Sequence, residues 1–235
     1  MRGVSKRLLW LAGLLAGCGH SGDAPIDSPP PIDAAPVPEL SPIAAGMSSW
    51  RVTTETITVD DMGNPDCQVV EGCVGAAGAR VLLRFPTVTG NLGNADLVMP
   101  PLPAPGVSDD VYLWSTCHGH HHVRDFASFE LFDGNHLRAT ARKQAFCLED
   151  SKPLANGGSG GKFTCTGEQG ISVGWTDIYV DSLPCEYIDV TDVAPGDYTL
   201  KVTINPDGNL PDSDPTNNVF TMPVTVPETP PPPAP

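Results

Sequence analysis

The clearest pattern in the chain is an alternation of apolar and polar residues over positions 198–204. The apolar positions are Tyr198, Leu200, Val202 and Ile204. Successive side chains of a strand point to opposite faces, so this pattern predicts a strand with one buried face. Residues 219–226 follow after a turn-rich connection, and we expect them to pair with this strand.

Shorter apolar or β-branched runs extend the same interpretation through the chain. Further strands are predicted at residues 52–59, 81–85, 111–114, 126–132 and 188–190. The 24 glycines and 26 prolines punctuate these runs, and no long helical period is present. The glycine-rich residues 153–174 are expected to form a loop. We therefore predict a mostly β fold, with an irregular β-sandwich core, long loops and little helix.

The two ends of the chain differ in composition from the middle. Residues 1–17 combine a basic start with a short apolar run, which is typical of a secretory signal. The end of this segment, where it meets Cys18, resembles a bacterial lipobox, which predicts lipid on Cys18 as the only membrane contact. The alternative is an ordinary signal peptide with a chance cysteine. We expect a Pro/Ala/Asp-rich tether at 18–36, one domain at 37–226 and a Pro-rich disordered tail at 227–235. This organisation predicts an exported protein, lipid-anchored at the bacterial outer membrane or cell surface.

The formal net charge of −15 bears on the class of partner. Such acidity argues against binding to nucleic acid and against a basic patch for anionic lipid. It suits cationic partners such as amines or metal ions, although acidity can also serve solubility alone. Removal of residues 1–17 would make the charge more negative, because that segment carries three basic residues and no acidic one.

Six cysteines remain in addition to Cys18, and an exported protein meets an oxidising compartment. They are Cys67, Cys73, Cys117, Cys147, Cys165 and Cys185. We therefore expect three disulfides, for which the sequence alone allows fifteen pairings. The sequence has no CxxC spacing, so a structural zinc site built from cysteines is disfavoured.

The strongest chemical feature is a cluster of four histidines within five consecutive positions. Imidazole is the commonest protein ligand for zinc, copper, iron and nickel. In a helix, His118, His121 and His122 would share a face, whereas in an extended chain His118, His120 and His122 would do so. Gly119 disfavours the helix. A straight strand would separate the first and last histidine by about 13 Å, so one metal requires a sharp bend, which Gly119 permits.

Six motifs occur in order along the chain. They are Val81-Leu82-Leu83-Arg84-Phe85-Pro86, the run Trp114…Cys117-His118-x-His120-x-His122, Phe146-Cys147-Leu148-Glu149-Asp150, Asp177-Ile178-Tyr179, residues 188–196, and Pro211-Asp212-Ser213-Asp214…Asn217-Asn218. In order and spacing they resemble the catalytic domain of the lysyl oxidase family, which would make residues 37–226 a lysyl-oxidase-like domain. The resemblance implies copper bound by His118, His120 and His122, and it implies no copper role for His121.

The resemblance also implies a protein-derived cofactor, lysine tyrosylquinone, formed from Lys143 and Tyr179. A phenol can be oxidised to a quinone, and an unprotonated lysine amine can add to it. By residue type alone, Lys143 would be a solvated charge and Tyr179 a core aromatic. Asp177 is the candidate general base, because it would share a strand face with Tyr179. His136 is a weaker candidate, and a structural turn is the alternative role for Asp177.

For the cysteines, the resemblance implies the pairs Cys67–Cys73 and Cys117–Cys165. The usual partners of Cys147 and Cys185 are missing, so these two are expected to pair with each other or to form a buried thiol pair. The resemblance further supports a calcium site of hard oxygen ligands, with an Asx-rich turn as the alternative. Its ligands would be Asp212, Asp214, Asn217, Asn218, Glu39 and the Leu40 carbonyl.

The function implied by these features is oxidative deamination of primary amines, peptidyl lysine or similar, dependent on copper and lysine tyrosylquinone. The partners would be an amine or lysine-containing substrate and oxygen, and the products an aldehyde, hydrogen peroxide and ammonia. One alternative is a non-catalytic extracytoplasmic copper-binding β-sandwich protein. Another is an adhesion module with an incidental histidine cluster. The presence of Lys143 and Tyr179 argues against the first alternative.

Overall fold

The structure is a computed structural model that describes residues 35–145, 147–155, 157 and 161–233, without the side chains of 142–145. The predicted signal and lipidated Cys18, nearly all of the tether and the Lys143 side chain lie outside these described residues. The described residues from Pro36 onward belong to one compact unit. Across the described part of the chain, no helix is both long and apolar enough to cross a membrane.

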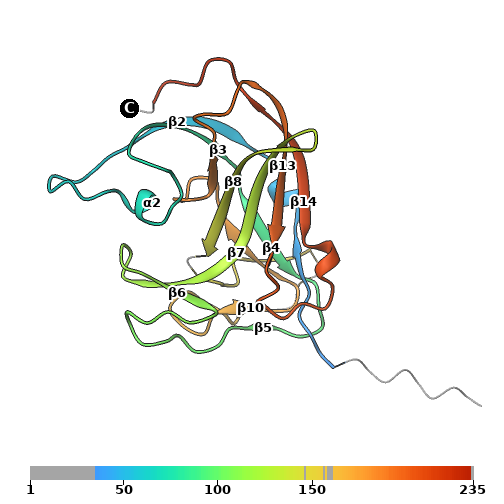
Figure 1. Cartoon of the computed structure of the whole chain (residues 1–235). Coiled ribbons are helices and arrows are strands. Elements are labelled where there is room, and N and C mark those ends of the chain that lie inside the picture. Colours follow the sequence, from blue (N-terminus) through green and yellow to red (C-terminus); the bar gives the residue numbers. More distant parts are fainter. Residues whose placement is uncertain (1–34, 146, 156, 158–160, 234–235) are drawn as a thin grey trace, which may run out of the picture. The chain divides into compact units, whose positions relative to one another are not determined.

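The largest sheet has five strands and contains most of the predicted β segments (Figure 1). In spatial order it runs β14 (Val219–Val226), β13 (Gly196–Ile204), β7 (His120–Asp133) and β6 (Tyr112–Ser115), with β8 (His136–Ala145) also paired to β7. The predicted pairing of the last two segments is confirmed, because β13 and β14 run antiparallel from Gly196 opposite Val226 to Thr203 opposite Val219. The four apolar positions of the alternating segment are all buried, as its pattern predicted.

The described residues also form three smaller antiparallel sheets and short helical turns. One sheet contains β1 (Leu40–Pro42), β4 (Thr87–Asn91), β11 (Trp175–Tyr179) and β9 (Lys152–Pro153). A second contains β12 (Tyr187–Asp189), β3 (Gly78–Arg84) and β2 (Arg51–Ile57), and a third β10 (Gly170–Ile171) and β5 (Leu97–Val98). The helical turns are α1 (Ala44–Met47), α2 (Cys67–Val70) and η1 (Pro215–Asn217).

One main hydrophobic core draws on the three larger sheets. Leu131 and Val202 come from the five-stranded sheet, while Leu83 and Val88 come from β3 and β4. The ring of Phe129 in β7 packs edge-to-face against the ring of Phe85, which follows β3, and the two centroids are 4.8 Å apart. The prediction of a mostly β fold with little helix is therefore confirmed.

Half of the described strands lie outside the predicted segments, and two of them, β8 and β4, show why. β8 pairs with β7 alone among the described strands, and most of its described side chains before residue 142 are exposed, so its sequence has no apolar alternation. β4 is buried on both faces despite its polar sequence Thr-Val-Thr-Gly-Asn. In the segment 153–174, which was expected to be a loop, the described residues are mostly irregular apart from β10 and the end of β9.

Candidate functional site

The histidine cluster lies in the hairpin that joins β6 to β7. Ser115 pairs with His120, and the backbone N–H of Gly119 donates to the Ser115 carbonyl at 2.9 Å. Gly119 has a φ of +68°, a conformation that side-chain-bearing residues rarely adopt. His118 therefore lies in the turn, while His120 and His122 are alternate residues of one strand. The extended interpretation and the bend at Gly119 are both confirmed.

The bend brings three imidazole rings together. The Nε2 atoms of His120 and His122 are 3.1 Å apart, and the ring centroid of His118 lies 5.3 Å from that of His122. One ligand atom from each ring lies within 4.8 Å of the other two. Metal–imidazole bonds are about 2.0–2.1 Å long, so two nitrogens on one ion are separated by roughly 3 Å. His120 and His122 have this separation, and His118 lies close enough to make the three histidines candidate ligands of one metal ion.

The three rings differ in their exposure to solvent. His122 is buried, His118 is partly buried and His120 is exposed. Burial, together with the nearby charge of His118, lowers the pKa of His120. His121 points away from the cluster. Its Nε2 lies 2.8 Å from the Val107 carbonyl oxygen, and its ring packs edge-on against the Trp114 indole. The structure thus separates His121 from the three candidate ligands.

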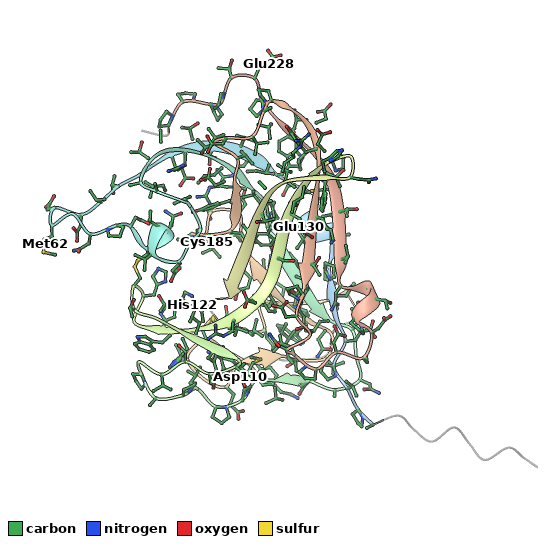
Figure 2. All side chains as sticks on the ribbon, in the orientation of Figure 1. Met62, Asp110, His122, Glu130, Cys185 and Glu228 are labelled. Carbon is green, nitrogen blue, oxygen red and sulfur yellow. A yellow bond between two sulfur atoms is a disulfide. The ribbon has the colours of Figure 1, made fainter. Side chains whose placement is uncertain are left out.

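The sequence interpretation missed one member of this site, Glu71. Its Oε1 lies 3.0 Å from Nδ1 of His118 and 3.8 Å from Nδ1 of His122. The hydroxyl of Ser115 donates to the same carboxylate oxygen at 2.7 Å. Figure 2 shows His122 and Cys185 beside α2, the helical turn that Glu71 follows. The only local signal was an acidic residue between two cysteines, Cys67 and Cys73, six positions apart.

The predicted quinone tyrosine and its neighbouring acid lie side by side in β11. Asp177 and Tyr179 are alternate residues of this strand, and they are only 3% and 4% exposed. The Tyr179 hydroxyl donates to the Cys147 carbonyl and accepts the Cys147 backbone N–H at 3.4 Å. Burial, followed by the negative charge of Glu149, raises the pKa of Asp177 well above its usual range. Burial, followed by the charge of Asp177, likewise raises the pKa of Tyr179.

A second acidic residue that the sequence interpretation did not single out lies near this phenol. Glu186 is fully buried, and its negative charge also contributes to the raised pKa of Tyr179. Thr87, the strand partner of Tyr179 in β4, donates its hydroxyl to the Glu186 carboxylate. No local pattern marks Glu186, because its neighbours come from a strand almost one hundred residues earlier in the chain.

Strand β7 connects the histidines to the tyrosine and to the backbone of Lys143. Lys143 pairs with Ala127 across the sheet, and the adjacent Phe126 ring lies 6.3 Å from that of Tyr179. The prediction for His136 as a base is wrong: it pairs with Asp133 at the opposite end of β7. Seven residues of strand separate His136 from Lys143, a distance of roughly 23 Å.

A cavity of about 320 Å³ opens beside both halves of the site. Its lining residues are Leu102, His120, His121, Cys147, Cys165 and Gln169. His120 belongs to the histidine cluster, and the backbone of Cys147 holds the Tyr179 hydroxyl. The cavity therefore lies between one member of the histidine cluster and the segment that contacts Tyr179.

Comparison with known proteins agrees with this arrangement. Residues 65–229 match a family model described as Lysyl oxidase. The chain belongs to the lysyl oxidase family. It is 39% identical over 171 residues to protein-lysine 6-oxidase of Homo sapiens, covering 67% of this chain and 39% of the relative. It is 37% identical over 171 residues to protein-lysine 6-oxidase of Sus scrofa, and the match covers 67% of this chain and 66% of the relative. It is also 37% identical over 166 residues to lysyl oxidase homolog 3B of Danio rerio, and that match covers 66% of this chain and 20% of the relative.

The cysteine pairings expected from the lysyl oxidase resemblance are wrong. The disulfides are Cys67–Cys117, Cys73–Cys185 and Cys147–Cys165, with Cα–Cα distances of 5.6, 5.3 and 5.3 Å. Cys67 in α2 is bonded to the histidine hairpin, whereas Cys73 in the loop after α2 is bonded to the region before β12. Neither the Cys147–Cys185 bridge nor the thiol pair is formed, because each of these cysteines meets another partner.

The residues expected to bind calcium lie together near η1. The amide nitrogens of Asn217 and Asn218 donate to Glu39 at 2.8 Å and to Asp212 at 2.7 Å. The Leu40 backbone N–H also donates to Asp212, at 3.2 Å. The Oδ1 atoms of both asparagines are buried without a hydrogen-bond partner, as suits ligands for a cation. Asp214 instead caps η1, in keeping with the Asx-turn alternative. Calcium binding stays a prediction.

Proposed function

We propose that this chain is an exported oxidase of primary amines, such as peptidyl lysine, that uses copper and lysine tyrosylquinone. The observation that carries the proposal is the convergence on strand β7 of three metal-suited imidazoles, the buried Tyr179 and the backbone of Lys143. Each of these relatives is longer than the part that the chain matches, and the printed name protein-lysine 6-oxidase refers to the relative. Membership of the family supports the same activity here.

Copper would be held by His118, His120 and His122. Copper(II) stands highest among divalent first-row metals in affinity for nitrogen ligands, although zinc also suits such a site. When present, copper and oxygen would support conversion of Tyr179 and Lys143 into a quinone that accepts electrons from the amine. The main chain of Cys147 holds the Tyr179 hydroxyl in place, and the Cys147–Cys165 disulfide secures that segment.

Asp177 is the proposed general base. A base must remove a proton from the carbon beside the substrate nitrogen, and the useful range of its pKa lies near the working pH. Burial moves the pKa of Asp177 in that direction, and its position beside Tyr179 places it within the same buried site. The apolar wall of the cavity at Leu102 suits the alkyl chain of an amine.

The net charge and the disulfides support the remaining parts of the proposal. A formal charge of −15 attracts ammonium groups and disfavours nucleic acid as a partner. Three disulfides among the described residues are typical of a protein that folds outside the cytoplasm. Lipid anchoring through Cys18 at a bacterial outer membrane or surface belongs to the proposal, as does calcium at the η1 site.

The test is a measurement of quinone absorbance and amine-dependent hydrogen peroxide release from copper-loaded protein. Alkyl monoamines and lysine-containing peptides serve as substrates. We expect both signals in the wild type and neither in Tyr179→Phe, which removes the reactive hydroxyl but retains the ring. His120→Ala, which removes one ligand, should also abolish both. Copper-loaded wild type that shows neither signal would refute the oxidase and favour the non-catalytic copper-binding protein.

A further inference from the structure

We propose that Glu71 is the positioning residue of the metal centre, a carboxylate that orients two of the three ligand histidines. The inference rests on the proposed function only in taking His118, His120 and His122 as metal ligands. It adds a fourth residue that acts on the metal through His118 and His122. Glu71 comes from a different part of the chain, 47 residues before His118.

One carboxylate oxygen of Glu71 lies near the Nδ1 atoms of two histidine rings. Oε1 of Glu71 is 3.0 Å from Nδ1 of His118 and 3.8 Å from Nδ1 of His122. The closer pair is an ion-pair contact at hydrogen-bonding distance, although its geometry is not that of an aligned hydrogen bond. On the opposite side of its ring, Nε2 of His122 faces Nε2 of His120 at 3.1 Å. In His122, Glu71 therefore lies on the Nδ1 side of the ring, and Nε2 faces the other candidate ligand.

Surrounding contacts hold the Glu71 side chain in this position. Its own backbone N–H donates to the Cys67 carbonyl at 2.8 Å, which ends the α2 turn. The Ser115 hydroxyl, which donates to Oε1, also accepts the backbone N–H of His118 at 3.0 Å. Disulfides Cys67–Cys117 and Cys73–Cys185 tie down the chain on both sides of Glu71. The side chain is 13% exposed, so water competes little for the carboxylate.

A carboxylate at Nδ1 has a defined effect on a histidine ligand. It fixes the tautomer with hydrogen on Nδ1, aims the Nε2 lone pair at the metal and makes that nitrogen more basic. Loss of such a partner typically weakens metal binding by about 10- to 100-fold. Here one carboxylate oxygen lies at hydrogen-bonding distance from His118 and makes a longer electrostatic contact, at 3.8 Å, with His122. The competing explanation is that Glu71 only stabilises the junction between α2 and the hairpin.

The test compares Glu71→Gln and Glu71→Ala with Glu130→Gln in the full chain, stripped of metal and reloaded with copper. Glu130 is a matched control because it lies on β7, farther along the strand that contains His120 and His122 (Figure 2). Its carboxylate forms a 2.8 Å ion pair with Lys201 of β13. The copper dissociation constant is measured by competition with a chelator, and the copper(II) environment by electron paramagnetic resonance. We expect copper binding about 10-fold weaker in Glu71→Gln and up to about 100-fold weaker in Glu71→Ala. Both variants should show a changed spectrum, and Glu130→Gln should match the wild type.

Thermal unfolding of the metal-free proteins separates the two explanations. A purely structural Glu71 would lower the unfolding temperature while leaving copper affinity and spectrum unchanged, and that result would overturn the proposal. If Glu71→Ala does not fold, Glu71→Gln, which retains the shape of the side chain, decides the question. Weaker binding in His120→Ala but in neither Glu71 variant would overturn the role of Glu71 alone. Wild type that binds no copper would overturn the metal site itself.

Discussion

Removal of the Cys67–Cys117 disulfide should damage both stability and the metal centre. The bridge closes a segment of 50 residues, for which loop-closure entropy predicts a loss of about 4 kcal/mol. The bridge also ties α2, and with it Glu71, to the turn that contains His118. The double variant Cys67→Ser/Cys117→Ser should therefore bind copper more weakly as well. The matched control, Cys147→Ser/Cys165→Ser, opens a segment of 18 residues and should lose about 3 kcal/mol.

The assay is urea unfolding of the metal-free proteins, followed by tryptophan fluorescence, with copper affinity measured on the same preparations. We expect copper affinity to fall in the first variant and to stay near that of the wild type in the control, because Cys147 lies on the tyrosine side of the site. Equal copper affinities in the two variants would contradict the reasoning about α2.

The pairing itself can be checked by peptide mapping without reduction. Cleavage after Glu71 places Cys67 and Cys73 on separate peptides, so their partners can be distinguished by mass. We expect the peptide with Cys67 to be linked to the one with Cys117. A linkage between Cys67 and Cys73 would refute the geometry from which the predicted losses were worked out.

Three further predictions follow from burial and charge. A raised pKa means that the folded state binds the Asp177 proton more tightly, so stability falls as the pH rises from the unfolded pKa of about 3.9 through the folded pKa. Asp177→Asn should remove that fall in pH-dependent unfolding and lower amine oxidation by about 10²-fold or more; an unchanged rate would exclude Asp177 as the base. Phe129→Ala, at a fully buried ring packed on Phe85, should cost about 3–5 kcal/mol in urea unfolding, and a loss below 1 kcal/mol would contradict the packing. Calcium should raise the unfolding temperature of the wild type but not of Asp212→Asn, and an equal rise in both would argue against the η1 site.

Local patterns in the sequence predicted about half of the described strands and selected the three candidate metal ligands. The alternation over β13 reflects a period of two that any half-buried strand must have, so no tertiary knowledge was needed to find it. The spacing of His118, His120 and His122, with Gly119 between the first two, likewise restricts geometry through backbone sterics alone. β8 escaped detection because its described side chains are mostly exposed, so burial imposes no pattern on it.

Contacts between distant segments were decided only by the tertiary structure. Six cysteines carry no information on their partners, because each pairing depends on where α2, the histidine hairpin and the region before β12 meet. Glu71 acquires its place under His118 and His122 from the same meeting of segments. His136 was a plausible base by residue type, yet the β7–β8 register puts it at the far end of the sheet. Chemistry that depends on distances of a few ångströms between segments tens of residues apart is set by packing, which a local pattern does not encode.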